Sequence, residues 1–410
     1  MSFVHNNENQ PNILRATTRP GMKREIMPYF QPIVSLQTLQ IYGYEALGRM
    51  VQGNEQKSLG PFFEDGTVSL EDHLRIDRIL REKAIRTFAA SDQSGCLFIN
   101  IKPSWIYSQY NGKGSLYTLE LLKQHKLSPV RLVIEITEEE FSGDLERLAD
   151  IVKLYRDAGC IIAVDDVGSG FSNLDRIALI QPRIMKMDLN MLKKASVHDG
   201  YKALLRSFSA IATQIGASLL VEGIETKADL QLALEIGARY AQGYLFSVAE
   251  AELQPSNRYV ELLFQEIRRY HDRNYQKFEL LAREEQAWNA KMELIIGESI
   301  GWVDADERIE QLLPLLASSF CIRIYACRDD GFQVSSNHFL NEEGSWSKDA
   351  SFRGTNWSWR PYFIPNILNM KRYKRGTMST GYVDLDSNRM IHTFSYPSRD
   401  GMYLFLDLAF

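Results

Sequence analysis

Short apolar runs alternate with longer amphipathic stretches over the first 250 residues. The apolar runs lie at 96–101, 131–137, 160–167, 183–188 and 218–224, and the amphipathic stretches at 71–90, 144–157, 199–215 and 226–236. Strands of this length alternating with helices of ten or more residues predict repeated βα units and a mainly parallel sheet. Their number fits a closed TIM-like (β/α)8 barrel better than an open sheet.

The beginning of this region departs from the regular pattern. Two strand-like segments, 27–36 and 39–50, are separated by only two residues, Gln37 and Thr38. Parallel neighbours need a longer crossover, so these two strands are expected to pair in antiparallel fashion. The predicted fold class is therefore α/β, a modified barrel with an antiparallel start.

The rest of the chain predicts one long helix and a second domain. Residues 257–296 carry apolar side chains at steps of three and four, with no internal Gly or Pro. Because such a helix cannot bury its stripe alone, it is expected to pair with its copy in a homodimer or to lie along a neighbouring domain; a spacer is the alternative. The last part of the chain predicts helix, hairpin, helix and a three-stranded meander, a small α+β domain.

Four regions follow from these patterns. They are a flexible N-terminal arm at 1–24, the barrel at 25–250, a connecting helix at 251–297 and the second domain at 298–410.

Composition and charge exclude several classes of function. A net charge of −5 gives no reason to expect DNA or an anionic membrane as a partner. No apolar run approaches the roughly 18 residues that span a bilayer, and the N-terminus lacks the apolar core of a signal peptide. The four cysteines form no CxxC pair, which disfavours zinc and disulfide frameworks. A cytoplasmic protein is expected.

Acidic and amide side chains stand at the ends of the predicted strands. They are Glu45, Asn100, Glu135, Asp165, Asp166 and Glu222, with Lys186 and Asp188 ending another strand. In a parallel barrel these ends meet at one face, and carboxylates gathered there need cations to offset their repulsion. Oxygen ligands without His or Cys favour Mg²⁺ or Mn²⁺. Two such ions would activate water for an in-line attack on phosphorus.

Several of these residues also have simpler explanations. Glu45 and Arg49 lie on the same face of one strand, so they either form a surface salt bridge or face a ligand, with Arg49 clamping a phosphate. Lys186 either serves the reaction or pairs with Asp188. Glu138 either belongs to the site or opens a helix. The Gly-Ser-Gly loop after Asp165 and Asp166 is by itself weak evidence.

Eight segments in order resemble the EAL-domain cyclic-di-GMP phosphodiesterases. They are YFQPIV (29–34), YEALGR (44–49), FINIKP (98–103), VIEITE (133–138), VDDVGSG (164–170), MKMD (185–188), VEGIET (221–226) and AQGYLF (241–246). The resemblance implies a modified barrel that hydrolyses cyclic-di-GMP to linear 5'-pGpG with two Mg²⁺ or Mn²⁺ ions, in bacterial second-messenger signalling.

The resemblance also implies roles for individual residues. The metal ligands would be Glu45, Asn100, Glu135, Asp165, Asp166 and Glu222. The catalytic residues would be Lys186, at the attacking water, together with Glu222, Asp166 and Glu138, which would anchor the Gly-rich loop. The substrate-binding residues would be Gln31, Arg49, Asp188 and Gln242.

One position departs from the family pattern. The family usually has Phe where this chain has Val167, and a smaller side chain there would loosen the packing under the Gly-rich loop. Because every metal-ligand position is intact, the expected function is an active phosphodiesterase. The alternative is a receptor that binds cyclic-di-GMP without cleaving it.

The C-terminal part resembles proteins in which an EAL domain is joined to a PAS-like domain. NWSWRPYF (356–363) and TFSYP (393–397) carry this likeness. Arg-Pro-Tyr-Phe segments recur in PAS and Cache sensors, where the Arg and its aromatic neighbours line a pocket for a small anionic or zwitterionic ligand. The candidates for such a sensor pocket are Trp357, Trp359, Arg360 and Tyr362; the aromatic core of a small sheet is the alternative.

Overall fold

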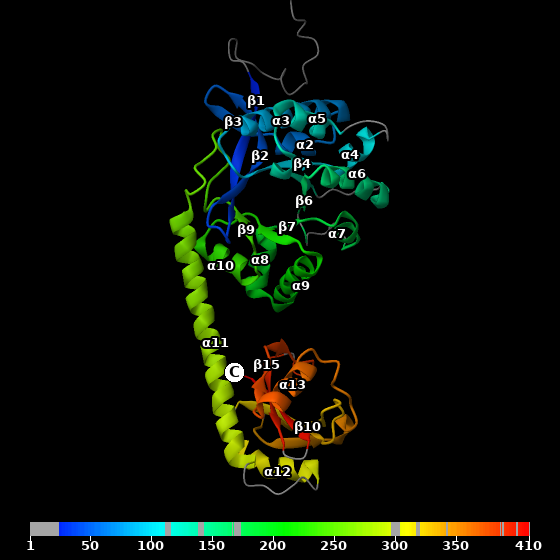
Figure 1. Ribbon diagram of the computed structural model, residues 1–410, viewed down its shortest axis with the longest axis vertical. Helices are drawn as coiled ribbons and strands as arrows, with labels where there is room; N and C mark the ends of the chain where they lie inside the picture. Colours follow the sequence, from blue (N-terminus) through cyan, green and yellow to red (C-terminus); the bar gives the residue numbers. More distant parts are fainter. Residues whose placement is uncertain are drawn as a thin grey trace, which may run out of the picture. The chain divides into compact units, whose positions relative to one another are not determined.

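The chain folds into two compact units that meet within one long helix (Figure 1). The computed structural model describes residues 24–110, 116–137, 143–165, 167, 174–296, 304–316, 320–341, 343–385, 387, 389–398 and 401–409. Unit 1 comprises Met1–His271 and unit 2 comprises Asp272–Phe410. Each unit has a hydrophobic core of its own.

Unit 1 is a closed barrel of parallel strands with an antiparallel start. Around the ring follow β1 (Glu25–Ser35), β9 (Tyr240–Gln242), β8 (Ser218–Val221), β7 (Ile184–Met187), β6 (Ile161–Val164), β5 (Leu132–Ile136), β4 (Cys96–Ile101) and β2 (Ile41–Gln52). Strand β1 is antiparallel to both of its neighbours, β2 and β9, and the pairs from β2 to β9 are parallel. The modified TIM-like barrel is thereby confirmed.

Helices follow the barrel strands and cover their outer side (Figure 1). They are α2 (Gly60–Glu64), α3 (Leu70–Ala89), α4 (Pro103–Gln109), α5 (Tyr117–His125), α6 (Leu145–Asp157), α7 (Leu174–Ile180), α8 (Leu189–Val197), α9 (Asp199–Ile215) and α10 (Lys227–Glu235). Because both faces of the parallel strands are covered, the strands are almost continuously apolar. All five residues of β5 are buried, and one of them is Glu135.

Unit 2 is an antiparallel sheet with helices on both faces. The strands run β12 (Trp346–Asp349), β11 (Asn337–Leu340), β10 (Cys321–Arg328), β16 (Met402–Leu408), β15 (Met390–Pro397) and β13 (Thr377–Met378), and β14 (Tyr382–Val383) also pairs with β15. Alternate residues of β10 and β16 belong to two cores, as the pleat requires. One core includes α12 (Ala305–Leu316) and the end of α11, and the other includes α13 (Phe363–Tyr373). The predicted α+β architecture is confirmed.

Helix α11 (Val260–Ile296) is one continuous helix of 37 residues, about 56 Å long. Its first turns pack on the barrel core through Leu263 and Ile267, and its last turns join the core of unit 2 through Trp288 and Met292. The helix therefore packs along its neighbours at both ends. None of the described helices combines the length and hydrophobicity of a membrane span.

Candidate metal centre at the mouth of the barrel

The ends of four adjacent parallel strands bring the predicted acids together. Glu135 lies near the end of β5 and Lys186 near the end of β7, while Asp165 and Glu222 directly follow β6 and β8. One carboxylate oxygen from each of Glu135, Asp165 and Glu222 lies within 4.8 Å of the others. The strand ends therefore bring these side chains together, as the sequence predicts.

Lys186 lies at the middle of the carboxylates. Its Nζ is 2.8 Å from Oε1 of Glu222, 3.4 Å from Oδ1 of Asp165 and 3.9 Å from Oε2 of Glu45. It also forms an ion pair with Oε1 of Glu135. Asp188 instead caps α8, accepting a hydrogen bond from N of Asn190 at 2.5 Å, so the alternative of a Lys186–Asp188 pair is wrong.

Glu45 is held from both sides by amides. Nδ2 of Asn100 donates to its Oε1 at 2.6 Å, and Nε2 of Gln242 donates to its Oε2 at 2.7 Å. Gln31 lies opposite Glu45 in the β1–β2 ladder and accepts a second hydrogen bond from Gln242 at 3.2 Å. Since Glu45 is buried and its ion pair is with Lys186, the alternative of a surface salt bridge with Arg49 is wrong.

Arg49 shares a hollow with Asn100, the residue that donates to Glu45. Arg49 lines this hollow of about 190 Å³ together with Asn100, Ala46 and other residues of β2 and α3. Its Nη1 donates to the carbonyl oxygen of Gly48 at 3.0 Å. In the predicted arrangement Arg49 would bind a phosphate of the ligand from this hollow, and that role stays a prediction.

Burial and mutual repulsion change the charges at this centre. Burial and the nearby Glu45 and Asp165 raise the pKa of Glu135 well above its usual value, against the attraction of Lys186. Burial acts to lower the pKa of Lys186, yet the surrounding carboxylates raise it well above its usual value. Lys186 therefore stays an ammonium, and one positive charge faces the carboxyl groups of Glu45, Glu135, Asp165 and Glu222.

The centre fits a hard divalent cation. Glu135 has no exposed surface, and its Oε2 accepts no hydrogen bond from any residue that the structure describes. A buried carboxylate oxygen without a donor is costly unless a cation binds it. The side chains at the centre supply only oxygen ligands besides Lys186, which suits Mg²⁺, Mn²⁺ or Ca²⁺. Glu45, Asn100, Glu135, Asp165 and Glu222 are the described residues that would hold such ions.

Two predicted site residues, Glu138 and Asp166, lie outside the described residues. Val167, which directly follows Asp166 in the chain, is described. Its side chain is buried in the barrel core, and its N donates to the carbonyl oxygen of Lys186 at 2.9 Å. The backbone after Asp165 is therefore tied to the strand that carries Lys186.

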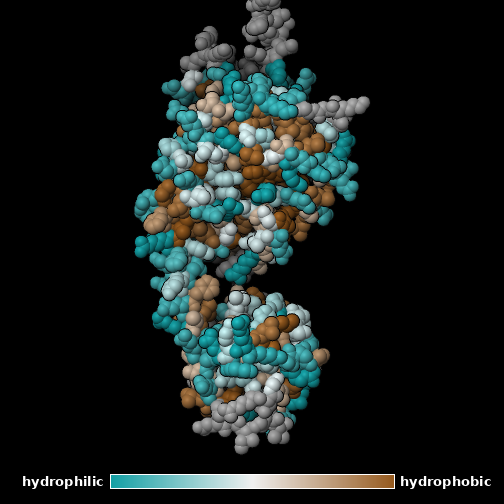
Figure 2. Space-filling view, in the orientation of Figure 1, coloured by the Kyte–Doolittle hydropathy of each residue, from teal (hydrophilic) through white to brown (hydrophobic). Residues whose placement is uncertain are grey.

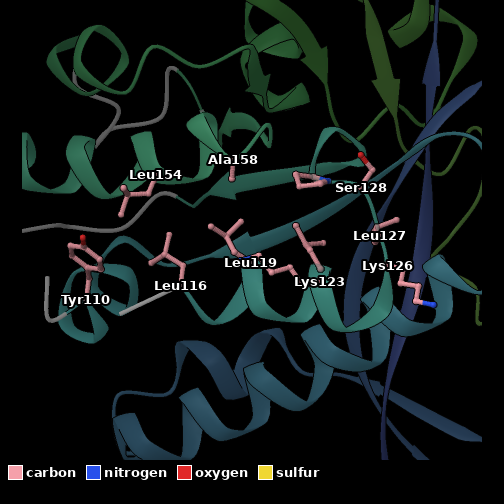
Figure 3. Close-up of a pocket in the computed structure, with 11 residues that line it drawn as sticks. Tyr110, Leu116, Leu119, Lys123, Lys126, Leu127, Ser128, Leu154 and Ala158 are labelled. Carbon is pink, nitrogen blue, oxygen red and sulfur yellow. The ribbon is translucent and has the colours of Figure 1, made fainter. Parts of the chain in front are cut away.

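An apolar hollow of about 740 Å³ lies elsewhere on the barrel, between α5 and α6. Figure 3 shows Leu116 and Leu119, at the start of α5 and within it, facing Leu154 of α6 and Ala158 just after α6 across this hollow. In Figure 2, hydrophobic residues lie exposed over this part of unit 1. The hollow shares no residue with the acidic cluster, so it is not part of the metal centre.

In unit 2 the four sensor candidates lie together. The guanidinium carbon of Arg360 is 4.6 Å from the ring centre of Trp359 and 5.7 Å from that of Trp357. Tyr362 stacks on Tyr382, with ring centres 5.3 Å apart. Trp357 and Tyr362 also pack against the core that includes α13, whereas Trp359 is exposed. The cluster therefore combines core packing with a half-buried cation.

The same unit holds a buried polar cluster that sequence reasoning missed. Asp407 is 1% exposed and accepts hydrogen bonds from Oγ1 of Thr393 at 2.7 Å and from Nη1 of Arg323 at 3.3 Å. Arg323 also forms an ion pair with Asp384. Burial raises the pKa of Asp407 to about 6. An acid inside the apolar run LFLDL (404–408) was the available signal.

Comparisons with known proteins agree with this architecture. The family model of the EAL domain matches residues 15–249, and that of the EAL-domain associated signalling protein domain matches residues 254–410. The chain is 36% identical over 391 residues to the uncharacterized EAL-domain containing protein YkuI of Bacillus subtilis, covering 94% of this chain and 95% of that protein. It is 31% identical to the cyclic di-GMP phosphodiesterase RocR of Pseudomonas aeruginosa, covering 54% of this chain and 57% of RocR.

A solved structure of YkuI matches the fold across both units. The TM-score is 0.86 at 34% sequence identity, and the match covers 94% of this chain and 96% of that chain. That crystal structure is described as a complex of YkuI with the substrate c-di-GMP and calcium. The chain belongs to the EAL-domain family, with an EAL domain followed by the EAL-domain associated signalling domain.

Proposed function

We propose that this protein is a phosphodiesterase that hydrolyses cyclic-di-GMP to linear 5'-pGpG with two Mg²⁺ or Mn²⁺ ions. The observation that carries the proposal is the cluster of Glu45, Glu135, Asp165 and Glu222 around the single ammonium of Lys186, in which Glu45, Glu135 and Lys186 are buried. The names of the relatives support the substrate, since RocR is a cyclic di-GMP phosphodiesterase and YkuI was crystallised with c-di-GMP and calcium.

The bound ions would polarise a water molecule and offset charge on the phosphate. The chain's own residues orient the reactants. Gln242 and Asn100 fix the carboxylate of Glu45 through hydrogen bonds to both of its oxygens. Arg49 would bind a phosphate oxygen at the rim, and Lys186 would hold the attacking water by donating from its ammonium. Asp166 would bind a metal ion, and Glu138 would anchor the Gly-rich loop. Gln31 and Asp188 would contact the substrate.

The test is hydrolysis by the purified full-length chain. With Mn²⁺ or Mg²⁺ present, we expect cyclic-di-GMP to be converted to 5'-pGpG, detected by chromatography, and EDTA to stop the reaction. Lys186→Met should lower kcat by at least about a hundredfold, because loss of one positioned hydrogen-bond donor at the reacting groups costs about that much or more. If cyclic-di-GMP binds but stays intact with either metal, the protein is instead a receptor for this nucleotide, and the proposed activity is wrong.

We propose further that unit 2 is a PAS-like sensor domain that regulates the barrel, and that the protein acts as a homodimer in the cytoplasm. The half-buried Arg360 beside Trp357 and Trp359 supports a small anionic or zwitterionic ligand. A screen of such compounds against the full-length chain by thermal shift tests this. A ligand that stabilises the native chain but not Arg360→Met would support the pocket, and equal stabilisation of both proteins would contradict it.

A further inference from the structure

A series of hydrogen bonds leads away from Glu45 on the side opposite to Asn100. Nε2 of Gln242 donates to Oε2 of Glu45 at 2.7 Å and to Oε1 of Gln31 at 3.2 Å. Nε2 of Gln31 in turn donates to the carbonyl oxygen of Ser247 at 3.1 Å. The series thus passes from the metal centre into the segment that follows the last barrel strand, β9.

The series continues to the first turn of α11. Oγ of Ser247 accepts a hydrogen bond from Nε2 of Gln254 at 3.1 Å, and Oε1 of Gln254 accepts one from the hydroxyl of Tyr259 at 2.6 Å. The carbonyl oxygen of Tyr259 accepts the bond from N of Leu263 at 2.9 Å, which is the first turn of the helix. Gln254 is 3% exposed and Tyr259 is 7% exposed, so water competes little for these bonds.

A second branch reaches the same carboxylate through the backbone. Tyr44 directly precedes Glu45 in β2. Its hydroxyl donates to the carbonyl oxygen of Gln254 at 2.5 Å and accepts from N of Gln254 at 3.0 Å. Gln254 is therefore bound both to the neighbour of Glu45 in the strand and to the side-chain series that ends on the Glu45 carboxylate.

We infer that Gln254 and Tyr259 are positioning residues, which make the divalent-ion affinity of the centre depend on where α11 begins. Neither residue touches the centre; they act on Glu45 through Gln242, Gln31 and Tyr44. Partners that orient a metal ligand are known to control its affinity for the ion. The inference rests on the proposed function only in taking Glu45 as a metal ligand.

The arrangement gives the barrel a physical means of regulation. Helix α11 begins at Val260, directly after Tyr259, and continues without a break to the core of unit 2. A ligand in unit 2 that displaces the first turn of α11 alters the bonds of Gln254, and with them the orientation of the Glu45 carboxylate. Such a ligand would regulate the affinity of the centre for the metal ion, a step that precedes substrate binding.

The test is Tyr259→Phe in the full-length chain, which removes one hydroxyl and keeps the ring. We expect the Mn²⁺ dissociation constant, measured from the electron paramagnetic resonance signal of free Mn²⁺, to rise roughly fivefold. Gln254→Met, which removes both hydrogen-bonding ends at similar length, should act in the same direction. The matched control is Tyr155→Phe, a buried tyrosine of α6 whose hydroxyl is 3.4 Å from Thr118 and outside the series. It should keep the native affinity, and thermal denaturation checks that all variants are folded.

The outcomes separate this inference from the proposed function. Native Mn²⁺ affinity in both Tyr259→Phe and Gln254→Met, or an equal loss in the Tyr155→Phe control, overturns the inference even if cyclic-di-GMP is hydrolysed. The predicted pattern of affinities supports it even if no 5'-pGpG forms, a result that overturns only the proposed function. A second check is Tyr259→Phe combined with Gln31→Leu. If the double variant loses less Mn²⁺ affinity than the product of the two single fold-losses, the two residues act through the same series of hydrogen bonds, as inferred. A loss equal to that product means that they act independently and contradicts the inference.

Discussion

Glu135 is a carboxylate with no exposed surface in a strand whose other residues are all apolar and buried. Such a group is tolerated in a fold only if a positive charge meets it. Lys186 provides one, but it is shared with Glu45, Asp165 and Glu222. At the residue scale the metal-free centre therefore has more carboxyl groups than positive charges, an arrangement that favours cation binding at the expense of stability.

Replacing Glu135 with Gln tests this balance. Burial and the neighbouring carboxylates disfavour the charged form of Glu135 in the metal-free centre, and Lys186 keeps other partners. A neutral amide at this position, Glu135→Gln, should therefore raise the melting temperature of the protein in EDTA by about 3 °C. The same change should weaken Mn²⁺ binding at least about tenfold. Calorimetry in EDTA and Mn²⁺ titration measure the two effects.

Glu266→Gln is the matched control for that experiment. Glu266 is also buried, but its carboxylate is satisfied by Nε2 of Gln231 at 2.9 Å and by Nζ of Lys227 at 3.2 Å. Glu266→Gln should lower the melting temperature and leave the Mn²⁺ affinity unchanged. A lower melting temperature in Glu135→Gln, with native Mn²⁺ affinity, would show that Glu135 is an ordinary structural acid.

Asp407 predicts a pH dependence for unit 2. Its pKa is raised by burial to about 6, above the ordinary value of 3.8, so the folded state holds this proton more tightly than the unfolded state. The stabilisation is fully present below pH 3.8 and is lost as the pH rises through 6, an amount of about 3 kcal/mol. Asp306, whose pKa is lowered mainly by hydrogen bonds from Arg353 and Ser336 that outweigh its burial, has the opposite sign and loses its stabilisation as the pH falls.

Comparison with Asp407→Asn isolates the contribution of Asp407. The free energy of unfolding is measured in urea between pH 4 and 7 by tryptophan fluorescence, which reports mainly on unit 2, since Trp105 is the single tryptophan before residue 272. The difference between the native chain and the variant should change by about 2 kcal/mol over this range, because part of the full effect is already lost at pH 4. A difference that is constant with pH would mean that Asp407 is ionised in the folded protein at pH 4.

At the scale of elements, α11 has an exposed middle between two packed ends. Tyr275 is 62% exposed and Phe278 is 63% exposed. Phe264, 51% exposed, lies fourteen residues before Phe278, two heptads on one helix face. A second copy of α11 would cover this stripe, which is the reason to expect a homodimer.

The variant Phe278→Glu tests the dimer. Light scattering should give the mass of a dimer for the native chain and should shift toward the monomer of 47.1 kDa in Phe278→Glu, because a charge would be buried between the helices. Lys277→Glu, on an adjacent exposed position, should leave the mass unchanged. A native chain that is monomeric at tens of micromolar, or a Phe278→Glu variant that remains dimeric, would contradict the pairing of α11.

The elements themselves were predictable because periodicity is local. The strands 96–101 and 218–224 and the helices 144–157 and 199–215 correspond to β4, β8, α6 and α9. The gathering of the acids was also predictable, because they stand at strand ends and the topology of a barrel brings these ends to one rim. The partners of each side chain were not. Gln242 meets Glu45 across 197 positions of sequence, and Thr393 meets Asp407 only through the β15–β16 ladder, contacts that packing determines and periodicity does not.

At the scale of the whole molecule, two separate cores are joined by one uninterrupted helix. The acidic centre lies in unit 1, and the aromatic cluster around Arg360 lies in unit 2. Since the cores are independent, we expect a change in unit 2 to act on unit 1 through the start of α11 and its bonds to Gln254, with the barrel itself unchanged.

The most direct measurement is anomalous diffraction at the manganese edge from crystals soaked with Mn²⁺ and cyclic-di-GMP. The account predicts two manganese peaks at the barrel mouth, within about 2.5 Å of carboxylate oxygens of Glu45, Glu135, Asp165 and Glu222, with a phosphate of the ligand between them and Arg49. The account is contradicted if these carboxylates bind no manganese while the nucleotide is present.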